Sequence, residues 1–442
     1  MANQEKSLPV ADRARRKIAR RILPFVFVLY IISYLDRANV AFAKLSMTAE
    51  LEFSEAVFGF GAGIFFIGYL FLEIPGALIV ERWSARKWIA RILVSWGICA
   101  TLMGFIRTPF NFYAARFLLG LAEAGFFPGI IVYLTHWFTG RDRARAMAGF
   151  IVGVPVSLMF GAPISSLFLR LHCFGLSGWR WVFILEGAPA VIFGIITWFY
   201  LTDHPRDAKW LDEDERKWIS GELEEERRHK RVSGHVSLWQ GLRQRNVILL
   251  GLALCLANVE GYAFVFWLPT TIHRASGLPL ISSTLWSALP FVVGLVAMVA
   301  SGHRSDRAGE RKFHAAIPLM LAATFFTLSA VPGQSFPMVL TWLCLTTAAG
   351  YSFPAPFWVL PTLTLGESAA AASIGLINLV GNLGGFIGPS AVGYVLLRTH
   401  SYPSGMMILA LGAMLGGLVL LGVKVKPLEH QTADPAFETN SA

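Results

Sequence analysis

Long apolar stretches separated by short polar segments dominate the pattern along this chain. A helix needs about 20 mostly apolar residues to cross the hydrocarbon core of a bilayer. The stretches that reach this length are 23–43, 56–80, 88–106, 112–138, 145–170, 180–202, 246–273, 283–302, 313–332, 337–361, 369–398 and 405–424. The pattern therefore predicts an all-α membrane protein with twelve transmembrane helices.

Composition and charge agree with that prediction. Charged residues make up only 15% of the chain, against roughly 25% in soluble domains. The net charge of +10 does not indicate nucleic-acid binding, because the basic residues occur in short clusters between apolar stretches. Loops assigned to one side hold 29 Lys and Arg, which predicts an inner-membrane protein with both termini cytoplasmic. The other side holds six, Lys44, Arg107, Arg170, Arg180, Arg274 and Arg398.

The chain contains an internal duplication around one long polar segment. Ala124-Gly125 recurs 225 residues later as Ala349-Gly350, and Arg82 recurs at the same offset as Arg307. Parallel repeats of six spans predict two six-helix bundles related by a pseudo-twofold axis, with a substrate site between them. The expected division is an N-terminal bundle, a linker, a C-terminal bundle and a cytoplasmic tail, at 1–202, 203–245, 246–425 and 426–442. Asp212 and Glu215 have capping-box spacing and predict a surface helix in the linker.

Ionisable side chains inside apolar spans are costly, about 2.5–3.5 kcal/mol each on insertion scales, and are usually functional. Asp36 and Arg37 point about 100° apart on a helix, so each needs a partner from another helix or a wet cavity. Arg116 and Glu123 lie seven residues apart on one face of the fourth span. We interpret Arg37 and Glu123 as functional and Arg116 as structural, and leave both roles open for Asp36. The remaining ionisable residues inside the predicted spans are Glu73, Arg91, Glu186 and Glu260.

Other residues are weaker candidates for substrate contacts. Tyr34 and Tyr69 offer hydroxyl groups, although tyrosines in spans also serve as packing residues. Asn378 and Asn382 share one helical face and either bind substrate or join two helices. Glu73 is expected near a span end, in a structural role. Glycines at 59, 61 and 63 lie inside a span and are expected to let helices approach closely. The four cysteines are widely spaced, and neither a metal site nor a cofactor is predicted.

Charged turns after the second and eighth spans resemble the signature of the major facilitator superfamily. They run from Gly76 through Glu81-Arg82 to Lys87, and from Gly302 through Asp306-Arg307 to Lys312. The chain further resembles the anion:cation symporter family of that superfamily, including its tartrate and phthalate transporters. That likeness rests on Tyr34-Leu-Asp36-Arg37-Ala-Asn39, Arg116 to Gly129, Pro356-Phe-Trp358-Val-Leu-Pro361 and Asn378 to Pro389.

The resemblance implies the major facilitator fold and import of small organic anions with protons. It assigns substrate binding to Arg37, to which we add Trp358 from the family motif, and proton coupling to Asp36 and Glu123. The four charged-turn residues Glu81, Arg82, Asp306 and Arg307 are expected to have structural or gating roles. Residues 151–170 contain no Gln, which favours a smaller acid than the sugar acids of that family.

The expected function is a proton-coupled symporter and not an enzyme. Substrate and Glu123 are expected to compete for Arg37, so that a displaced Glu123 takes up a proton. The expected partners are an organic anion, protons and membrane lipid, with no nucleic acid, and the protein is expected to act as a monomer. Two alternatives stay open, namely an exporter of amphipathic compounds and a sensor that kept the fold without transport.

Overall fold

The computed structural model describes residues 9–232, 244–364 and 367–425. Within these residues, twelve helical segments are long and apolar enough to cross a membrane, as the sequence predicts. The first group of helices comprises α2 (Val10–Glu50), α3 (Glu55–Arg82), α4 (Ala85–Leu102), η1 (Met103–Phe105), α5 (Pro109–Glu123), α6 (Phe126–Thr135), α7 (Gly140–Ile151), α8 (Gly153–Phe168) and α9 (Gly178–Tyr200).

The polar linker separates this group from a second one. The linker contains η2 (Pro205–Asp207) and α10 (Glu213–Val232). The second group comprises α12 (Arg245–Ser276), α13 (Leu280–Trp286), α14 (Ala288–Ala308), α15 (Lys312–Ser329), α16 (Phe336–Ser352), α17 (Pro354–Phe357), α18 (Leu360–Thr364), α19 (Glu367–Thr399) and α20 (Tyr402–Leu421). We call α2–α9 the N-terminal half and α12–α20 the C-terminal half. The exact boundaries of the four predicted segments stay a prediction.

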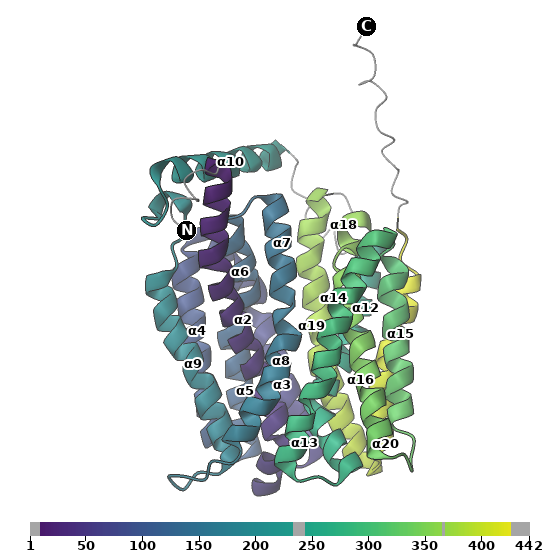
Figure 1. The fold of residues 1–442 in the computed structure, drawn as a ribbon. Coiled ribbons are helices and arrows are strands. Elements are labelled where there is room, and N and C mark those ends of the chain that lie inside the picture. The colour runs from purple at the N-terminus through teal and green to yellow at the C-terminus, as the bar shows by residue number, and fades with distance from the viewer. Residues whose placement is uncertain (1–8, 233–243, 365–366, 426–442) are drawn as a thin grey trace.

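The two halves stand side by side, with α10 lying across one end of the N-terminal half (Figure 1). Within the halves, α4 packs on α9 and α3 on α5, whereas α12 packs on α19 and α15 on α20. Between the halves, α3 contacts α19, α8 contacts α14 and α2 contacts α12. We call the end that carries α10 the linker end. Both the start of α2 and the end of α20 lie there (Figure 1).

Local sequence sets where several helices begin. Ser54, Ser84 and Thr108 each accept a hydrogen bond from a backbone N–H three residues later, at the first turns of α3, α4 and α5. Such caps satisfy N–H groups that have no partner within the helix. The polar residues between apolar stretches therefore stop one helix and start the next over only a few residues.

Several spans predicted as continuous helices are interrupted. The fourth span breaks between α5 and α6, where Gly125 adopts φ +84°, a conformation that glycine reaches without steric cost. A Cβ atom at Gly125 would also lie 3.1 Å from the Cα of Gly76 in α3. The fifth, eighth and tenth spans are interrupted as well, at the junctions α7–α8, α13–α14 and α16–α17. Apolar composition predicts a span but does not reveal such breaks of one or two residues.

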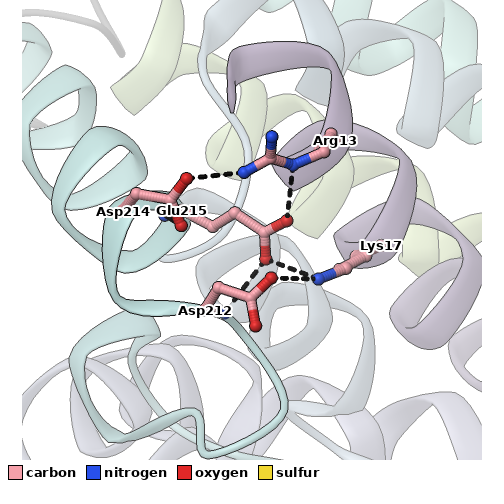
Figure 2. A network of polar contacts seen from close by, with 5 residues as sticks. All are labelled: Arg13, Lys17, Asp212, Asp214 and Glu215. Atoms are coloured by element: carbon pink, nitrogen blue, oxygen red, sulfur yellow. Dashed lines mark hydrogen bonds and ion pairs between the residues drawn. The ribbon is translucent and has the colours of Figure 1, made fainter. Parts of the chain in front are cut away.

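The linker helix α10 is attached to α2 by a network of ion pairs (Figure 2). Arg13 contacts Asp214 at 2.5 Å and Glu215 at 3.5 Å, and Lys17 contacts Asp212 at 2.8 Å and Glu215 at 2.9 Å. The backbone N–H of Asp212 donates to Glu215 Oε2 at 3.0 Å, which is one of the two hydrogen bonds of a capping box. The Glu215 N–H donates to Asp214 Oδ1 at 2.9 Å and not to Asp212. Since the Glu215 side chain is fully buried between these partners, α10 is fixed to the N-terminal half.

Close packing of backbones joins the halves at the end opposite the linker. An added Cβ at Gly59 would lie 2.3 Å from the Pro389 carbonyl oxygen, and one at Gly63 would lie 2.8 Å from that of Phe386. On the other side, a Cβ at Gly393 would lie 2.4 Å from the Glu55 carbonyl oxygen. These contacts confirm that Gly59 and Gly63 let α3 and α19 approach closely, whereas a Cβ at Gly61 would meet the Phe112 ring of α5.

One basic residue lies elsewhere than the sequence suggested. We expected Lys44 in an outer loop, but it is buried inside α2, where its Nζ pairs with Glu55 Oε2 at 2.8 Å. The same Nζ lies 4.2 Å from the ring centroid of Trp267, whose indole N–H donates to Glu55 at 3.1 Å. Lys44 belongs to α2 and Trp267 to α12, so this cluster also connects the halves opposite the linker end.

Candidate substrate-binding site

A cavity of about 1020 Å³ lies between the two halves. The N-terminal half lines it with residues of α2, α3, α6, α7 and α8, and the C-terminal half with residues of α12, α14, α15, α16, α17 and α19. Met147 of α7 and Trp358 after α17 line its linker-end part. Because the halves touch at the other end through Gly59 and the Lys44 cluster, the cavity extends from the middle of the protein toward the linker end.

Arg37 forms an ion pair with Glu123 at the wall of this cavity. The Arg37 side chain is 12% exposed and Glu123 only 1% exposed. Glu123 Oε1 receives both Arg37 Nη2 and the Ser33 hydroxyl, the latter at 2.9 Å, whereas the buried Oε2 has no hydrogen-bond partner among the described residues. The structure thus brings together the two residues that sequence analysis interpreted as functional. A second Arg37 nitrogen donates to the Tyr262 hydroxyl at 3.4 Å.

Aromatic rings surround the Arg37 guanidinium. Its central carbon lies 5.0 Å from the ring centroid of Tyr34, 5.3 Å from Phe65 and 5.4 Å from Tyr69. Such rings attract a cation through their electron-rich faces and stabilise its position while leaving its N–H groups free to donate. Tyr34, Tyr69 and Trp358 all line the cavity, as expected of substrate-contacting residues.

Asp36 points away from the cavity and into the N-terminal half. Its carboxylate accepts the indole N–H of Trp96 at 2.5 Å and the Asn39 amide at 3.4 Å, and its side chain is fully buried. Asp36 and Arg37 therefore find separate partners, as their angular separation on the helix required. Asp36 is not among the residues that line the cavity.

Arg116 occupies a position apart from the cavity. It is fully buried and donates to the backbone carbonyls of Gly61 at 3.4 Å and Ala62 at 3.1 Å in α3. Its guanidinium also lies 4.9 Å from the ring centroid of Phe65. These contacts join α5 to α3 and fit the structural interpretation of this residue.

Glu73 lies on the cavity wall. It is nine residues from the last residue of α3 and accepts hydrogen bonds from the side-chain amides of Asn378 and Asn382 in α19. All three residues line the cavity. A single acid in an apolar run gives no sign of its partners across the interface, so sequence analysis did not predict these contacts. The two amides bind a neighbouring helix here, one of the two roles left open for them.

The charged turns lie at the linker end. Asp306 pairs with Arg311 at 2.7 Å, which ties the end of α14 to the start of α15. Arg307 is exposed in the last turn of α14. The side chains of Glu81 and Arg82 lie outside the described residues. The roles expected for these four residues stay a prediction.

Sequence analysis missed Tyr262, and the duplication could have revealed it. Tyr262 lies 225 residues after Arg37, which is the offset of the internal repeat. The two residues therefore occupy corresponding positions of the first and seventh spans and meet near the interface of the halves. Corresponding positions close to a pseudo-twofold axis are expected to face each other.

Twelve spans in two bundles around a central cavity define the class of protein as a multi-pass membrane transporter of two halves. Residues 26–389 match the family model of the Major Facilitator Superfamily. The chain belongs to this superfamily, and it is a transporter and not an enzyme.

Similar proteins support this assignment. A protein of Agrobacterium vitis named "Putative tartrate transporter" is 42% identical over 95% of this chain and 98% of its own length. The "Quinolone resistance transporter" of Acinetobacter baumannii is 35% identical over 94% of this chain and 96% of its own length. The crystal structure of a bacterial homologue of the human lysosomal transporter Spinster shares the fold, with a TM-score of 0.75 at 14% identity, over 91% of this chain and 96% of that one.

Proposed function

We propose that this protein is a proton-coupled symporter that imports a small organic carboxylate across the inner membrane by alternating access. The observation that carries the proposal is the Arg37–Glu123 pair at the wall of a cavity between the halves. A guanidinium stays charged under all physiological conditions and offers carboxylates a planar, bidentate set of donors. The similarity to a protein named for tartrate transport agrees with an acidic substrate.

Competition for Arg37 supplies the coupling step. A substrate carboxylate that reaches Arg37 takes the place of the Glu123 carboxylate, which then loses its counter-charge in a buried position. Burial favours the neutral form of a carboxyl group, so Glu123 takes up a proton when the substrate binds. Ser33 already donates to Glu123 and keeps the protonated side chain in place. Asp36, which is buried against Trp96 of α4, is the candidate for binding a second proton or for triggering closure.

The orientation follows from charge and geometry. The linker end carries most of the Lys and Arg of the loops, so it is assigned to the cytoplasm by the positive-inside rule. With that orientation the cavity faces inward, while Gly59 and the Lys44 cluster close the outer end. The reverse state requires the halves to separate at these contacts and to meet at the linker end.

Uptake by the purified protein in liposomes tests the proposal. Glu123→Gln keeps the shape of the side chain but cannot exchange a proton, so we expect substrate exchange to persist and uphill uptake driven by a pH gradient to be lost. Glu186→Gln is the matched control, because Glu186 is a buried carboxyl of the same half that contacts Ser165 at 2.5 Å and does not line the cavity. Uphill uptake that still follows the pH gradient in Glu123→Gln would exclude Glu123 as the coupling group.

Arg37→Lys tests the binding role separately. Lysine keeps the charge but loses the planar set of donors, so we expect the apparent affinity for the acid to fall roughly tenfold or more. An unchanged affinity would remove Arg37 from the site.

A second candidate function is export of amphipathic compounds. The cavity is large and mostly lined by apolar and aromatic side chains, and a relative at 35% identity is named for quinolone resistance. Cells that express the protein would then accumulate less quinolone than cells without it, and no acid would be taken up. Acid uptake with unchanged quinolone accumulation favours the symporter.

A further inference from the structure

Glu260 is a buried acid on the C-terminal wall of the cavity. It lies near the middle of α12, is 5% exposed and lines the cavity. Among the described residues, no hydrogen bond or ion pair reaches its carboxyl group. Buried polar groups nearly always have partners, and an unpartnered one in a cavity wall commonly contacts a ligand.

The other buried acids of the spans all have donors. Trp96 donates to Asp36, Arg37 and Ser33 donate to Glu123, Ser165 donates to Glu186, and Asn378 and Asn382 donate to Glu73. Glu123 and Glu186 each keep one oxygen without a partner, but among these five buried acids Glu260 is the one in which no described donor reaches either carboxyl oxygen. A ligand in the cavity can use this carboxyl group without breaking any contact within the protein.

The surroundings of Glu260 leave room for a ligand. A Cβ atom added at Gly350 would lie 4.0 Å from Glu260 Oε2, so that side of the carboxyl group is not obstructed. The hydroxyl groups of Thr346 and Thr347 on the same wall donate to the carbonyls of Trp342 and Leu343 within α16.

Arg37 lines the same cavity from the N-terminal half, so the two halves present different chemistry. The N-terminal wall offers the Arg37 cation, since the carboxyl group of Glu73 is already bound by Asn378 and Asn382, and the C-terminal wall offers the carboxyl group of Glu260. A ligand that contacts both needs a carboxylate at one end and a hydrogen-bonding group at the other. An acid with an apolar far end would leave Glu260 unpartnered, which costs affinity relative to a two-ended acid.

We propose that Glu260 is a specificity-determining residue whose carboxyl group hydrogen-bonds the end of the substrate remote from Arg37. It selects short acids that carry at that end a hydroxyl, which donates to Glu260, or a second carboxyl group, which shares one proton with Glu260, over acids with an apolar end. This inference rests on the proposed function, because it takes a carboxylate bound at Arg37 as its starting point.

Three four-carbon acids test the inference by isothermal titration calorimetry on the purified, full-length protein. Tartrate and succinate have two polar ends, whereas butyrate has one. Glu260→Leu removes the hydrogen-bonding group but keeps a side chain of similar size. We expect it to lower the affinity for tartrate and for succinate roughly tenfold and to change the affinity for butyrate less than twofold. Glu260→Gln keeps a donor and an acceptor without the charge, and we expect tartrate affinity within threefold of the wild type or tighter. Glu186→Gln is again the control for replacing a buried acid.

The outcomes separate the inference from the function on which it rests. If the wild type binds none of the three acids, the proposed function and this inference both fail. If the acids bind but Glu260→Leu weakens butyrate as much as tartrate, or weakens neither, the inference fails and the function stands. Equal loss of tartrate in Glu260→Gln and Glu260→Leu would also overturn it, because charge and not hydrogen bonding would then be the requirement. Size-exclusion profiles and thermal unfolding without ligand establish that each variant is folded.

Discussion

The contact between α3 and α19 gives a sharp prediction for the conformational equilibrium. In Gly59→Ala, the new Cβ would lie 2.3 Å from the Pro389 carbonyl oxygen, whereas side-chain carbons essentially never approach closer than 3.0 Å. The two backbones must therefore separate by about 0.7 Å or more at this point. The obstruction is a backbone atom, which cannot rotate away as a side chain would. The clash exists only while the end opposite the linker is closed.

The energetic consequence follows from that state dependence. Inserting a methyl group into a well-packed contact costs about 1–3 kcal/mol. Because the cost applies to one of the two states, the equilibrium shifts toward the state open at this end by roughly 5- to 150-fold. Gly149→Ala is the matched control, since Gly149 is also helical and has no heavy atom within 4 Å of an added Cβ.

Distances between spin labels can measure the shift. Cys173 is exposed in the loop after α8, and Val331 is 49% exposed after α15, so labels at Cys173 and Val331→Cys report on the end opposite the linker. The other three cysteines are replaced by alanine. We expect Gly59→Ala to move the distance distribution to longer values and Gly149→Ala to leave it unchanged. An unchanged distribution in folded Gly59→Ala would refute the reasoning from backbone contact.

Two further predictions concern single polar clusters. Glu55→Gln leaves the buried Lys44 without its carboxylate partner, so we expect the free energy of unfolding in detergent to fall by about 1–3 kcal/mol. The second change Lys44→Met should restore much of this loss. A double variant whose loss of stability equals the sum of the losses of the two single variants would contradict the pairing. For Glu310, burial opposes ionisation, but hydrogen bonds from the backbone N–H groups of Phe313 and His314 and from the His314 ring lower the net pKa. A lowered pKa stabilises the fold at pH values above the ordinary pKa of the acid, and this contribution is lost as the pH falls through the lowered value. Melting temperatures of Glu310→Gln should therefore depend less on pH in the acid range than those of the wild type.

The sequence was sufficient for features that repeat or that depend on local chemistry. Span number follows from apolar length, the two halves follow from the 225-residue offset, and the start of α10 follows from Asp212 and Glu215. The separate partners of Asp36 and Arg37 follow from helix geometry alone. Each of these conclusions needs only the chain itself and the properties of a bilayer.

Features that depend on contacts between distant segments could not be predicted. Lys44 at the edge of an apolar run looks like a loop residue until Glu55 and Trp267 are placed around it. Glu73 gives no local sign of its two asparagine partners, which lie more than 300 residues away in the sequence. The break at Gly125 depends on the close approach of Gly76, so the apolar pattern alone predicts an uninterrupted helix.

The position of the Arg37–Glu123 pair has an electrical consequence. Both residues belong to the N-terminal half, so their opposite charges move together whenever that half tilts. Moving one elementary charge through a membrane potential of 100 mV is worth about 2.3 kcal/mol, but a neutral pair transfers no net charge. The return of the unloaded carrier is therefore insensitive to voltage as far as these two residues are concerned. In the proposed symport cycle, the voltage dependence is then set by the charges of the substrate and of the protons carried with it.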